Sequence, residues 1–234
     1  MDRVVLLDFD SICYKAMEDL DSYKDRVDDI ISQIVEETSA THYKVFLEAP
    51  GSKSFRELLN YKYKVNRKGK PLPINFKEIK DYIIESYNPY LSYLEETDDS
   101  IISTLKYLSD NYPLTEVIVA ANDKDYKTKE LVYYDLYYGR FGEIVDISKK
   151  EANYNFWIQM LVGDSSDNVS GVRGIGRVSA EKILKSSKNY FISTYRVYYS
   201  KYGIDAREEF KENYLMLNLR DDTRPCTEFD KVEF

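Results

Sequence analysis

The chain has 234 residues, 43% hydrophobic and 32% charged, which suits a globular protein with a sizeable core. It contains one histidine and two cysteines, so histidine-activated nucleophiles, zinc sites rich in His or Cys, and a disulfide framework are all disfavoured. The net charge of −8 excludes a uniformly basic nucleic-acid-binding surface, although basic side chains gather in two segments.

Short apolar runs rich in β-branched residues are typical of strands buried on both faces. Three such runs predict strands at residues 4–7, 43–47 and 117–121. Apolar residues at helical spacing predict helices between them, at residues 27–35, at residues 79–94 with an interruption near Pro89, and at residues 101–108. Strands alternating with helices predict an α/β domain whose central, mostly parallel sheet is flanked by helices.

The pattern changes in the last third of the chain. Residues 131–147 contain two strand-like pieces around a Gly139-Arg140-Phe141-Gly142 turn, which predicts a hairpin. The pattern then becomes helical. We expect an α/β core over residues 1–150 and a helical region over residues 151–234. No stretch is typical of a signal peptide or a membrane span, and a reducing, cytoplasmic compartment is expected.

Acidic residues follow each of the first three predicted strands. Asp8, Glu48 and Asp123 should therefore meet where the carboxyl ends of parallel strands share one sheet edge. Mg²⁺ and Mn²⁺ prefer oxygen ligands, and two-metal sites use several carboxylates. The acidic candidates are Asp8, Asp10, Glu48, Glu96, Asp98, Asp99, Asp123, Asp125, Asp164 and Asp167.

Each acidic cluster also has an ordinary structural interpretation. Residues 96–99 could cap a helix, because acidic side chains favour a helix N-terminus. Asp123 and Asp125 could form a turn, and so could Asp164 and Asp167. Taken together, the clusters favour a shared metal site, since they could all lie at one edge of the sheet.

The first basic segment, residues 53–70, holds seven basic side chains and one acidic side chain. Its cations could hold phosphates while its tyrosines stack on bases; the alternative is a solvated helix face. The candidates for nucleic-acid contact here are Arg56, Lys62, Tyr63, Lys64, Arg67 and Lys68.

Residues 163–176 read G-D-S-S-D-N-V-S-G-V-R-G-I-G, which places two carboxylates directly before a glycine turn. Glycines let a phosphate approach the backbone closely, although a plain structural turn is the default interpretation. Residues 173–201 also hold seven basic side chains and one acidic one. The candidate DNA contacts are Gly171, Arg173, Gly174, Gly176, Arg177 and Lys182.

Together these motifs resemble the 5′-nuclease superfamily, which includes flap endonucleases, the 5′–3′ exonuclease domain of bacterial DNA polymerase I and phage 5′ exonucleases. Phe55-Arg56 and Tyr63-Lys64-Val65-Asn66-Arg67 match one block of that family. Residues 96–99, residues 123–125 and residues 163–176 match three more, in order. The resemblance spans almost the whole chain.

The resemblance implies a PIN-like fold with a basic helical arch at about residues 53–85 and a C-terminal helix–hairpin–helix region. It implies two Mg²⁺ ions, with Mn²⁺ as a substitute, and a K⁺ ion bound by the backbone carbonyls of Val172 and Ile175. Lys64 and Arg67 would act at the scissile phosphate. The implied ligands of the divalent ions are Asp8, Glu96, Asp98, Asp99, Asp123, Asp125, Asp164 and Asp167.

The implied activity is that of a metal-dependent 5′–3′ exonuclease or flap endonuclease. It would hydrolyse DNA at 5′ ends, nicks or flaps, leave 5′-phosphates, and serve replication or the removal of RNA primers. RNA–DNA hybrids are a further expected substrate. We expect a monomer without a membrane partner, acting in the host cytoplasm if a phage encodes it.

The sequence departs from the family pattern at several positions. Thr97 replaces a usual alanine, and Asp10 stands where small or hydroxyl residues are usual. The family's acid before the Phe-Arg block falls on Ala49, with Glu48 beside it. The arch segment is short, and no sliding-clamp peptide is recognisable.

Two other functions stay open at this point. A PIN-type ribonuclease would also use acidic residues on an α/β fold, although the basic block and the glycine turn count against it. A non-catalytic protein that binds DNA structures could have lost its metal site, and the unplaced acid near Glu48 keeps that alternative open.

Overall fold

The computed structural model describes residues 2–16, 22–67, 69, 71–72, 74–137 and 141–232. Within those residues the elements follow the order β1 (Arg3–Asp8), α1 (Phe9–Ala16), α2 (Tyr23–Thr38), β2 (His42–Glu48), α3 (Phe55–Leu59), η1 (Val65–Arg67), α4 (Phe76–Ser86), β3 (Tyr90–Ser92), α5 (Thr97–Asn111), β4 (Glu116–Ala121), η2 (Lys124–Thr128), β5 (Leu131–Asp135), β6 (Glu143–Ile147), α6 (Lys149–Val162), α7 (Arg177–Lys185), α8 (Tyr190–Tyr202), η3 (Gly203–Asp205), α9 (Ala206–Leu217) and β7 (Asp230–Lys231).

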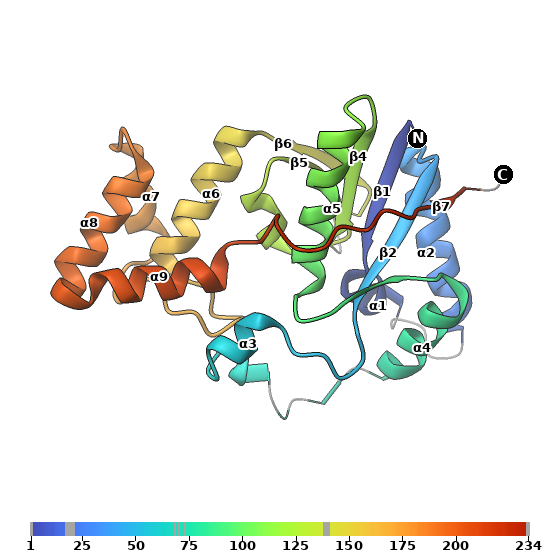
Figure 1. Cartoon of the computed structure of the whole chain (residues 1–234), viewed down its shortest axis with the longest axis horizontal. Coiled ribbons are helices and arrows are strands. Elements are labelled where there is room, and N and C mark those ends of the chain that lie inside the picture. The colour runs from blue at the N-terminus through green and yellow to red at the C-terminus, as the bar shows by residue number, and fades with distance from the viewer. Residues whose placement is uncertain are drawn as a thin grey trace.

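One mixed sheet runs through the α/β part in the order β3-β2-β1-β4-β5-β6, with β7 paired to β2 (Figure 1). The β1, β2, β3, β4 and β5 pairings are parallel, whereas β6 and β7 run antiparallel to their neighbours. Because β2 and β4 both flank β1 in parallel, the residues that follow these three strands emerge at one edge of the sheet. This confirms the predicted α/β class and mostly parallel sheet.

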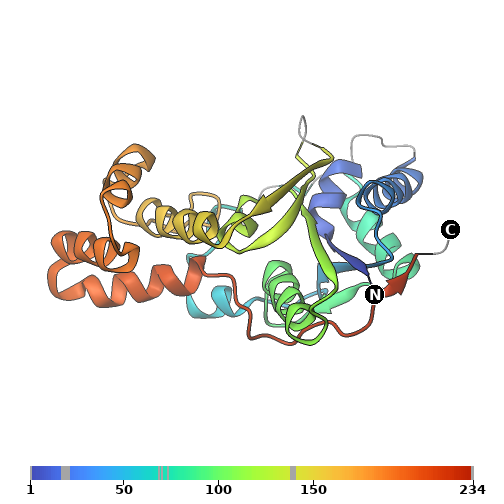
Figure 2. The same cartoon turned by 90° about the horizontal axis from the view of Figure 1, so that it is seen from above.

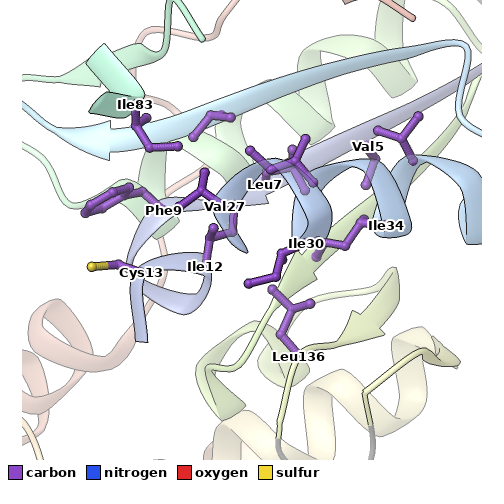
Figure 3. Close-up of a cluster of buried hydrophobic side chains, with 14 of the residues drawn as sticks. Val5, Leu7, Phe9, Ile12, Cys13, Val27, Ile30, Ile34, Ile83 and Leu136 are labelled. Atoms are coloured by element: carbon purple, nitrogen blue, oxygen red, sulfur yellow. The ribbon is translucent and has the colours of Figure 1, made fainter. Parts of the chain in front are cut away.

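The central strands β1, β2 and β4 are buried on both faces over most of their length, which explains their continuous apolar sequences. Alternate β1 residues divide between two cores: Val5 and Leu7 face α1, α2 and α4, and Val4 and Leu6 face α5. Figure 3 shows the first of these cores, where Ile12 of α1 and Ile30 of α2 pack beside Leu7. The acid-bearing strand ends are thus held between two rigid layers.

The C-terminal helices α6, α7, α8 and α9 lie together at one end of the molecule (Figure 2). They pack around a third apolar cluster, which includes Leu161, Leu184 and Tyr198. Figure 1 shows this group of helices beside the sheet, with α6 leading to it from β6. After α9 the chain returns across the α/β part, where Leu219 and Cys226 join the α5 core. The proposed boundary near residue 150 stays a prediction.

Most predicted elements are confirmed, and one is wrong. The predicted helix at residues 79–94 ends at Ser86, and Tyr90–Ser92 forms strand β3 against β2. Proline disfavours helical conformation at the residue before it, so Pro89 ends the helical pattern while β2 offers a free edge. The β5–β6 hairpin is confirmed, although Gly139 and Arg140 of its expected turn lie outside the described residues. No helix in the described part is long and apolar enough to cross a membrane.

Candidate active site

The first group of acids lies where β1 and β4 end. Asp8, the last residue of β1, is 7% exposed and accepts hydrogen bonds from the Ser11 hydroxyl at 3.3 Å and the Tyr126 hydroxyl at 3.4 Å. Burial, together with the charges of Asp10 and Asp123, raises the pKa of Asp8 to about 8. The predicted convergence of Asp8 and Asp123 is therefore found in the structure.

Glu48 ends β2 and is exposed, yet it also belongs to this edge. Although part of the side chain is open to solvent, the surrounding protein atoms desolvate its carboxylate and raise its pKa to about 7; the charges of Glu96 and Asp10 act in the same direction, and that of Lys64 opposes them. Asp10 is the second residue of α1. Desolvation of its carboxylate likewise raises its pKa. Glu48 therefore lies near the other acids, whereas Ala49 is a buried side chain that offers no ligand.

The second group lies at the N-terminus of α5. Glu96, Asp98 and Asp99 can each place one carboxylate oxygen within 4.8 Å of the others. Glu96 and Asp99 also form a capping box, so the expected structural role exists alongside any metal role. Burial and the charges of Asp99 and Glu96 raise the pKa of Asp98 well above its ordinary value. Such crowding of carboxylates favours a cation.

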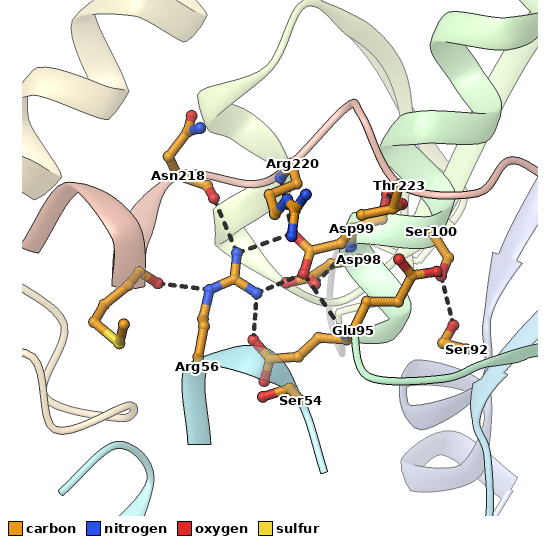
Figure 4. Close-up of polar contacts among 12 residues, drawn as sticks. Ser54, Arg56, Ser92, Glu95, Asp98, Asp99, Ser100, Asn218, Arg220 and Thr223 are labelled. Atoms are coloured by element: carbon orange, nitrogen blue, oxygen red, sulfur yellow. Dashed lines mark hydrogen bonds and ion pairs between the residues drawn. The ribbon is translucent and has the colours of Figure 1, made fainter. Parts of the chain in front are cut away.

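Asp99 differs from the other two acids because one guanidinium, that of Arg56, contacts both of its carboxylate oxygens (Figure 4). The Arg56 guanidinium donates to both of them, at 2.6 and 2.9 Å, and the backbone N–H of Arg220 donates to one at 2.8 Å. The side chain is 0% exposed. Its expected role as a metal ligand stays a prediction, and its contacts here are those of a residue that fixes Arg56.

The third group comes from η2 and from the loop after α6. Asp164 is 2% exposed and accepts hydrogen bonds from Ser166 N at 2.8 Å and Lys124 Nζ at 2.9 Å. Burial disfavours its charge, but the Ser166 and Lys124 hydrogen bonds outweigh burial and lower its pKa. Burial and the charges of Asp123 and Asp164 raise the pKa of Asp125 to about 8.

Electrostatic contacts connect the three groups into one site. The charges of Asp8, Asp98 and Asp123 all act on the buried Tyr126 hydroxyl, whose pKa is raised mainly by burial. The Tyr63 hydroxyl lies within hydrogen-bond distance of both Glu96 and Asp167, at 2.9 Å each, and so bridges the two carboxylates. The residues brought together are Asp8, Asp10, Glu48, Glu96, Asp98, Asp99, Asp123, Asp125, Asp164 and Asp167.

Every candidate metal-ligand atom in this site is a carboxylate oxygen, and Mg²⁺ and Mn²⁺ prefer such ligands. Two acids with pKa values near 8 would be largely protonated at neutral pH unless a cation compensates their charge. The residues present therefore fit divalent, oxygen-bound ions.

Two cations of the basic segment reach into the site. Lys64 contacts Glu96, and Arg67 contacts Asp167. Burial disfavours the charge on Lys64, but Glu96 and Asp167 outweigh it and raise its pKa, so this side chain stays charged. Lys64 has φ 52° and donates its backbone N–H to Asp167 O at 2.9 Å, which fixes the segment against the acidic loop.

Tyr63 and Arg56 are not placed as their predicted DNA contacts require. Tyr63 is 3% exposed and Arg56 is 1% exposed, so neither can reach a base or phosphate in this structure. Both side chains carry polar groups that satisfy buried carboxylates, and this draws them inward. Sequence alone cannot separate an inward cation from an outward one in a segment this basic.

The remaining predicted DNA contacts lie partly in the basic segment and partly in the glycine turn and α7. Lys62, Arg173, Arg177 and Lys182 are exposed, whereas Lys68 lies outside the described residues. Gly174 and Gly176 have open space where a Cβ would stand, so their backbone is accessible. Gly171 is buried against Gly163, where a Cβ would approach backbone atoms to 2.3 Å, so it closes the turn rather than facing outward.

The carbonyls proposed for K⁺ lie in the same turn. The Val172 carbonyl already accepts the Ile175 N–H at 2.9 Å. A carbonyl oxygen has a second lone pair, so a cation could still bind there. The K⁺ site stays a prediction.

Sequence reasoning missed Gln159 and Lys124, which contact the acids of the third group. Lys124 stands between two candidate ligands, so its position was a usable signal. Gln159 lies five residues before Asp164 in a helix, and its contact with Asp125 depends on tertiary packing.

Comparison with known proteins gives several relatives, although no family model matches the chain. An exodeoxyribonuclease of Enterobacteria phage T3 is 26% identical over 148 residues, which cover 57% of this chain and 48% of that protein. A protein named flap endonuclease Xni from Shewanella baltica is 24% identical over 179 residues, 73% of this chain and 67% of that protein. The chain is thus similar in sequence to proteins named as an exonuclease and a flap endonuclease, which agrees with the resemblance of its motifs to the 5′-nuclease superfamily.

The chain also shares its fold with solved structures. Two structures of the phage T5 D15 protein, one with metal ions and one a product-like complex with DNA and metal ions, give TM-scores of 0.71 and 0.70. Each covers 93% of this chain and 89% of its own, at 16% identity. The chain spans less than half of several curated relatives, including 16% of a DNA polymerase I from Caldicellulosiruptor bescii, with which it is 30% identical over 141 residues.

Proposed function

We propose that this chain is a metal-dependent 5′ nuclease that hydrolyses DNA phosphodiesters at 5′ ends, nicks or flaps. The observation that carries the proposal is the convergence of ten acids with Lys64 and Arg67 at one sheet edge, next to an open glycine turn. The named activities of its relatives support the same function. Replication or removal of RNA primers would be the setting.

The divalent ions would be held by Asp8, Glu96, Asp98, Asp123, Asp125, Asp164 and Asp167, with Asp10 and Glu48 close by. When bound, they would lower the pKa of a water molecule and offset charge on the scissile phosphate. We assign Mg²⁺ as the resident ion, since the proposed ligand atoms are all carboxylate oxygens.

The chain's own cations would bind and orient the phosphate. Lys64 is partly exposed beside Glu96, and Arg67 is 51% exposed beside Asp167, so both can turn from a carboxylate to a phosphate oxygen. The planar Arg67 guanidinium suits two phosphate oxygens at once, whereas Lys64 acts as a point charge. Placing both cations beside the acids aligns the phosphate with the metal site.

The glycine turn and α7 would hold the duplex. The turn at residues 171–176 leads into α7, whose first residue, Arg177, is exposed. Backbone N–H groups at a helix N-terminus favour a phosphate, and they position DNA without reading its sequence. We propose that α6, the turn and α7 form the helix–hairpin–helix expected from the sequence, and that K⁺ binds the same turn. The arch at residues 53–85 and action as a monomer are parts of the same proposal.

The proposal is tested by cleavage of labelled flap, nicked and blunt DNA, an RNA–DNA hybrid and single-stranded RNA, with Mg²⁺ or with EDTA. We expect 5′-phosphate products from DNA that depend on Mg²⁺. Efficient cutting of RNA without cutting of DNA would indicate a PIN-type ribonuclease instead. Binding of branched DNA without any cleavage would indicate a non-catalytic structure-binding protein.

A matched pair of variants separates the site from general effects of charge. Asp123→Asn removes a proposed ligand, whereas Asp110→Asn changes an exposed acid at the far end of α5. We expect cleavage to be lost only in the first. Equal activity of the two variants would contradict the proposed site.

A further inference from the structure

Gln159 lies in the last turn of α6 and contacts two of the proposed metal ligands. Its side-chain Nε2 donates to Asp125 Oδ1 at 2.8 Å and approaches Asp164 Oδ2 at 3.5 Å. The residue is 9% exposed. Asp125 belongs to η2 and Asp164 follows α6, so one amide joins two acid-bearing segments that are distant in sequence.

The other amide atom shows that this arrangement is not explained by packing. Gln159 Oε1 is buried and has no hydrogen-bond partner in the part of the chain that the structure describes. A buried acceptor without a donor costs stability, and a methionine of similar size would fill the same space without that cost. Exchanging the two amide atoms would turn an oxygen toward two carboxylates, which is electrostatically worse.

The uncharged amide of Gln159 is a suitable hydrogen-bond donor between Asp125 and Asp164, because these two carboxylates would together bind a cation. The amide draws Asp125 and Asp164 toward one point without bringing a positive charge that would compete with a metal ion. Lys124 also contacts Asp164, at 2.9 Å, but its side chain is 66% exposed and free to move away. The contacts of Gln159 are made by a side chain that burial holds in place.

We propose that Gln159 is a positioning residue, which holds Asp125 against Asp164 at the spacing that one divalent ion requires. This inference rests on the proposed function, because it assigns a role within the same metal site. Residues that hydrogen-bond to metal ligands fix the orientation of those ligands, and their loss weakens metal binding.

The direct test is the affinity of the protein for Mn²⁺ without DNA, measured by electron paramagnetic resonance or calorimetry. In Gln159→Met we expect Mn²⁺ affinity to fall about tenfold, within the range typical of such outer partners. The melting temperature in EDTA should stay unchanged or rise, because the unpaired oxygen is gone. Gln33→Met, at an exposed position of α2, is the matched control and should change neither quantity.

A double-mutant cycle tests whether Gln159 acts through Asp125. In an Asp125→Asn background, we expect Gln159→Met to cause little further loss of Mn²⁺ affinity, since the ligand that it orients has already been changed. An unchanged affinity in Gln159→Met, or full additivity in the cycle, would overturn the inference. A fall in melting temperature with unchanged Mn²⁺ affinity would also overturn it, by showing a purely structural role.

Measurements on the wild-type protein distinguish failure of the proposed nuclease function from failure of the proposed role of Gln159. Wild-type protein that binds no Mn²⁺ would overturn both the metal site and this inference. Wild-type protein that binds Mn²⁺ but cuts no nucleic acid would overturn the nuclease activity alone, and the binding measurements would still decide the role of Gln159.

Discussion

Arg56 and Asp99 form a buried, bidentate ion pair that joins α3, in the basic segment, to the acidic N-terminus of α5 (Figure 4). Arg56 also donates to Glu96 at 2.8 Å and to the backbone carbonyls of Met216 and Asn218, at 3.0 and 2.9 Å. One guanidinium therefore connects α3, α5 and the end of α9. Glu96 owes part of its placement to this connection.

Replacing Arg56 by methionine should leave Asp99 buried without a compensating charge. Breaking a buried pair in this way costs about 3–5 kcal/mol, so we expect a marked fall in the free energy of unfolding. Chemical denaturation measures it. Arg207→Met, on an exposed face of α9, should have little effect. The double variant Arg56→Met with Asp99→Leu should recover part of the loss; a double variant less stable than Arg56→Met would contradict the pairing.

This ion pair also shows where sequence reasoning stops. Asp8 and Asp123 could be placed from sequence, because each follows a buried apolar run and parallel neighbouring strands end together. The role of Asp99 could not, because its partner lies 43 residues earlier in a segment whose cations looked exposed. Strand β3 was missed since three residues carry too little periodicity to outweigh a helical pattern.

Asp164→Asn should nearly abolish cleavage while sparing DNA binding. The substitution keeps the shape of the side chain but removes the charge that Lys124 now contacts at 2.9 Å. A ligand should matter more than the ~10–100-fold effect of an outer partner. Single-turnover cleavage and fluorescence anisotropy in Ca²⁺ measure the two quantities. Turnover close to wild type at saturating Mg²⁺ would exclude this role.

Lys64→Ala should slow the chemical step more than it weakens the binding of duplex DNA. Lys64 lies among the acids rather than on the open surface, and loss of one group that stabilises developing charge typically costs about 10²–10³ in rate. Lys182→Ala, at an exposed position of α7, should instead weaken binding and leave the single-turnover rate at saturation unchanged. An unaltered single-turnover rate in Lys64→Ala would remove that residue from the mechanism.

Removing divalent metal should make stability fall as pH rises. Burial raises the pKa of Asp8 and of Asp125 from 3.8 to about 8, with like charges adding to the effect. The folded state therefore binds more protons than the unfolded state between those pH values, and the free energy of unfolding decreases with pH across that window. In EDTA we expect a higher melting temperature at about pH 5.5 than at about pH 8.

Divalent metal should change that trend, because a metal ion binds the deprotonated acids and protons compete with it. The rise in melting temperature on adding Mn²⁺ should be larger at about pH 8 than at about pH 5.5. Asp125→Asn should reduce both the pH dependence in EDTA and the effect of Mn²⁺. A metal effect that is equal at the two pH values would show that the ion binds elsewhere.

Substitutions at two glycines near the turn should distinguish effects on folding from effects on DNA binding. A Cβ at Gly163 would lie 2.3 Å from the Val169 carbonyl oxygen, and φ is +81°, so Gly163→Ala must displace the backbone beside Asp164. We expect lower stability and loss of cleavage together. Gly176 has an ordinary φ, and a Cβ added there would have nothing within 4 Å, so Gly176→Ala should leave the melting temperature unchanged.

If a phosphate approaches the backbone at Gly176, the added methyl group should still weaken duplex binding, because only glycine allows so close a contact. Fluorescence anisotropy on nicked and flap DNA measures this effect, and Mn²⁺ affinity without DNA should be unaffected in the same variant. Normal DNA affinity in Gly176→Ala would place the duplex elsewhere on the C-terminal helices. Weaker binding at constant stability would locate it at the turn, nine residues beyond Asp167 of the proposed metal site.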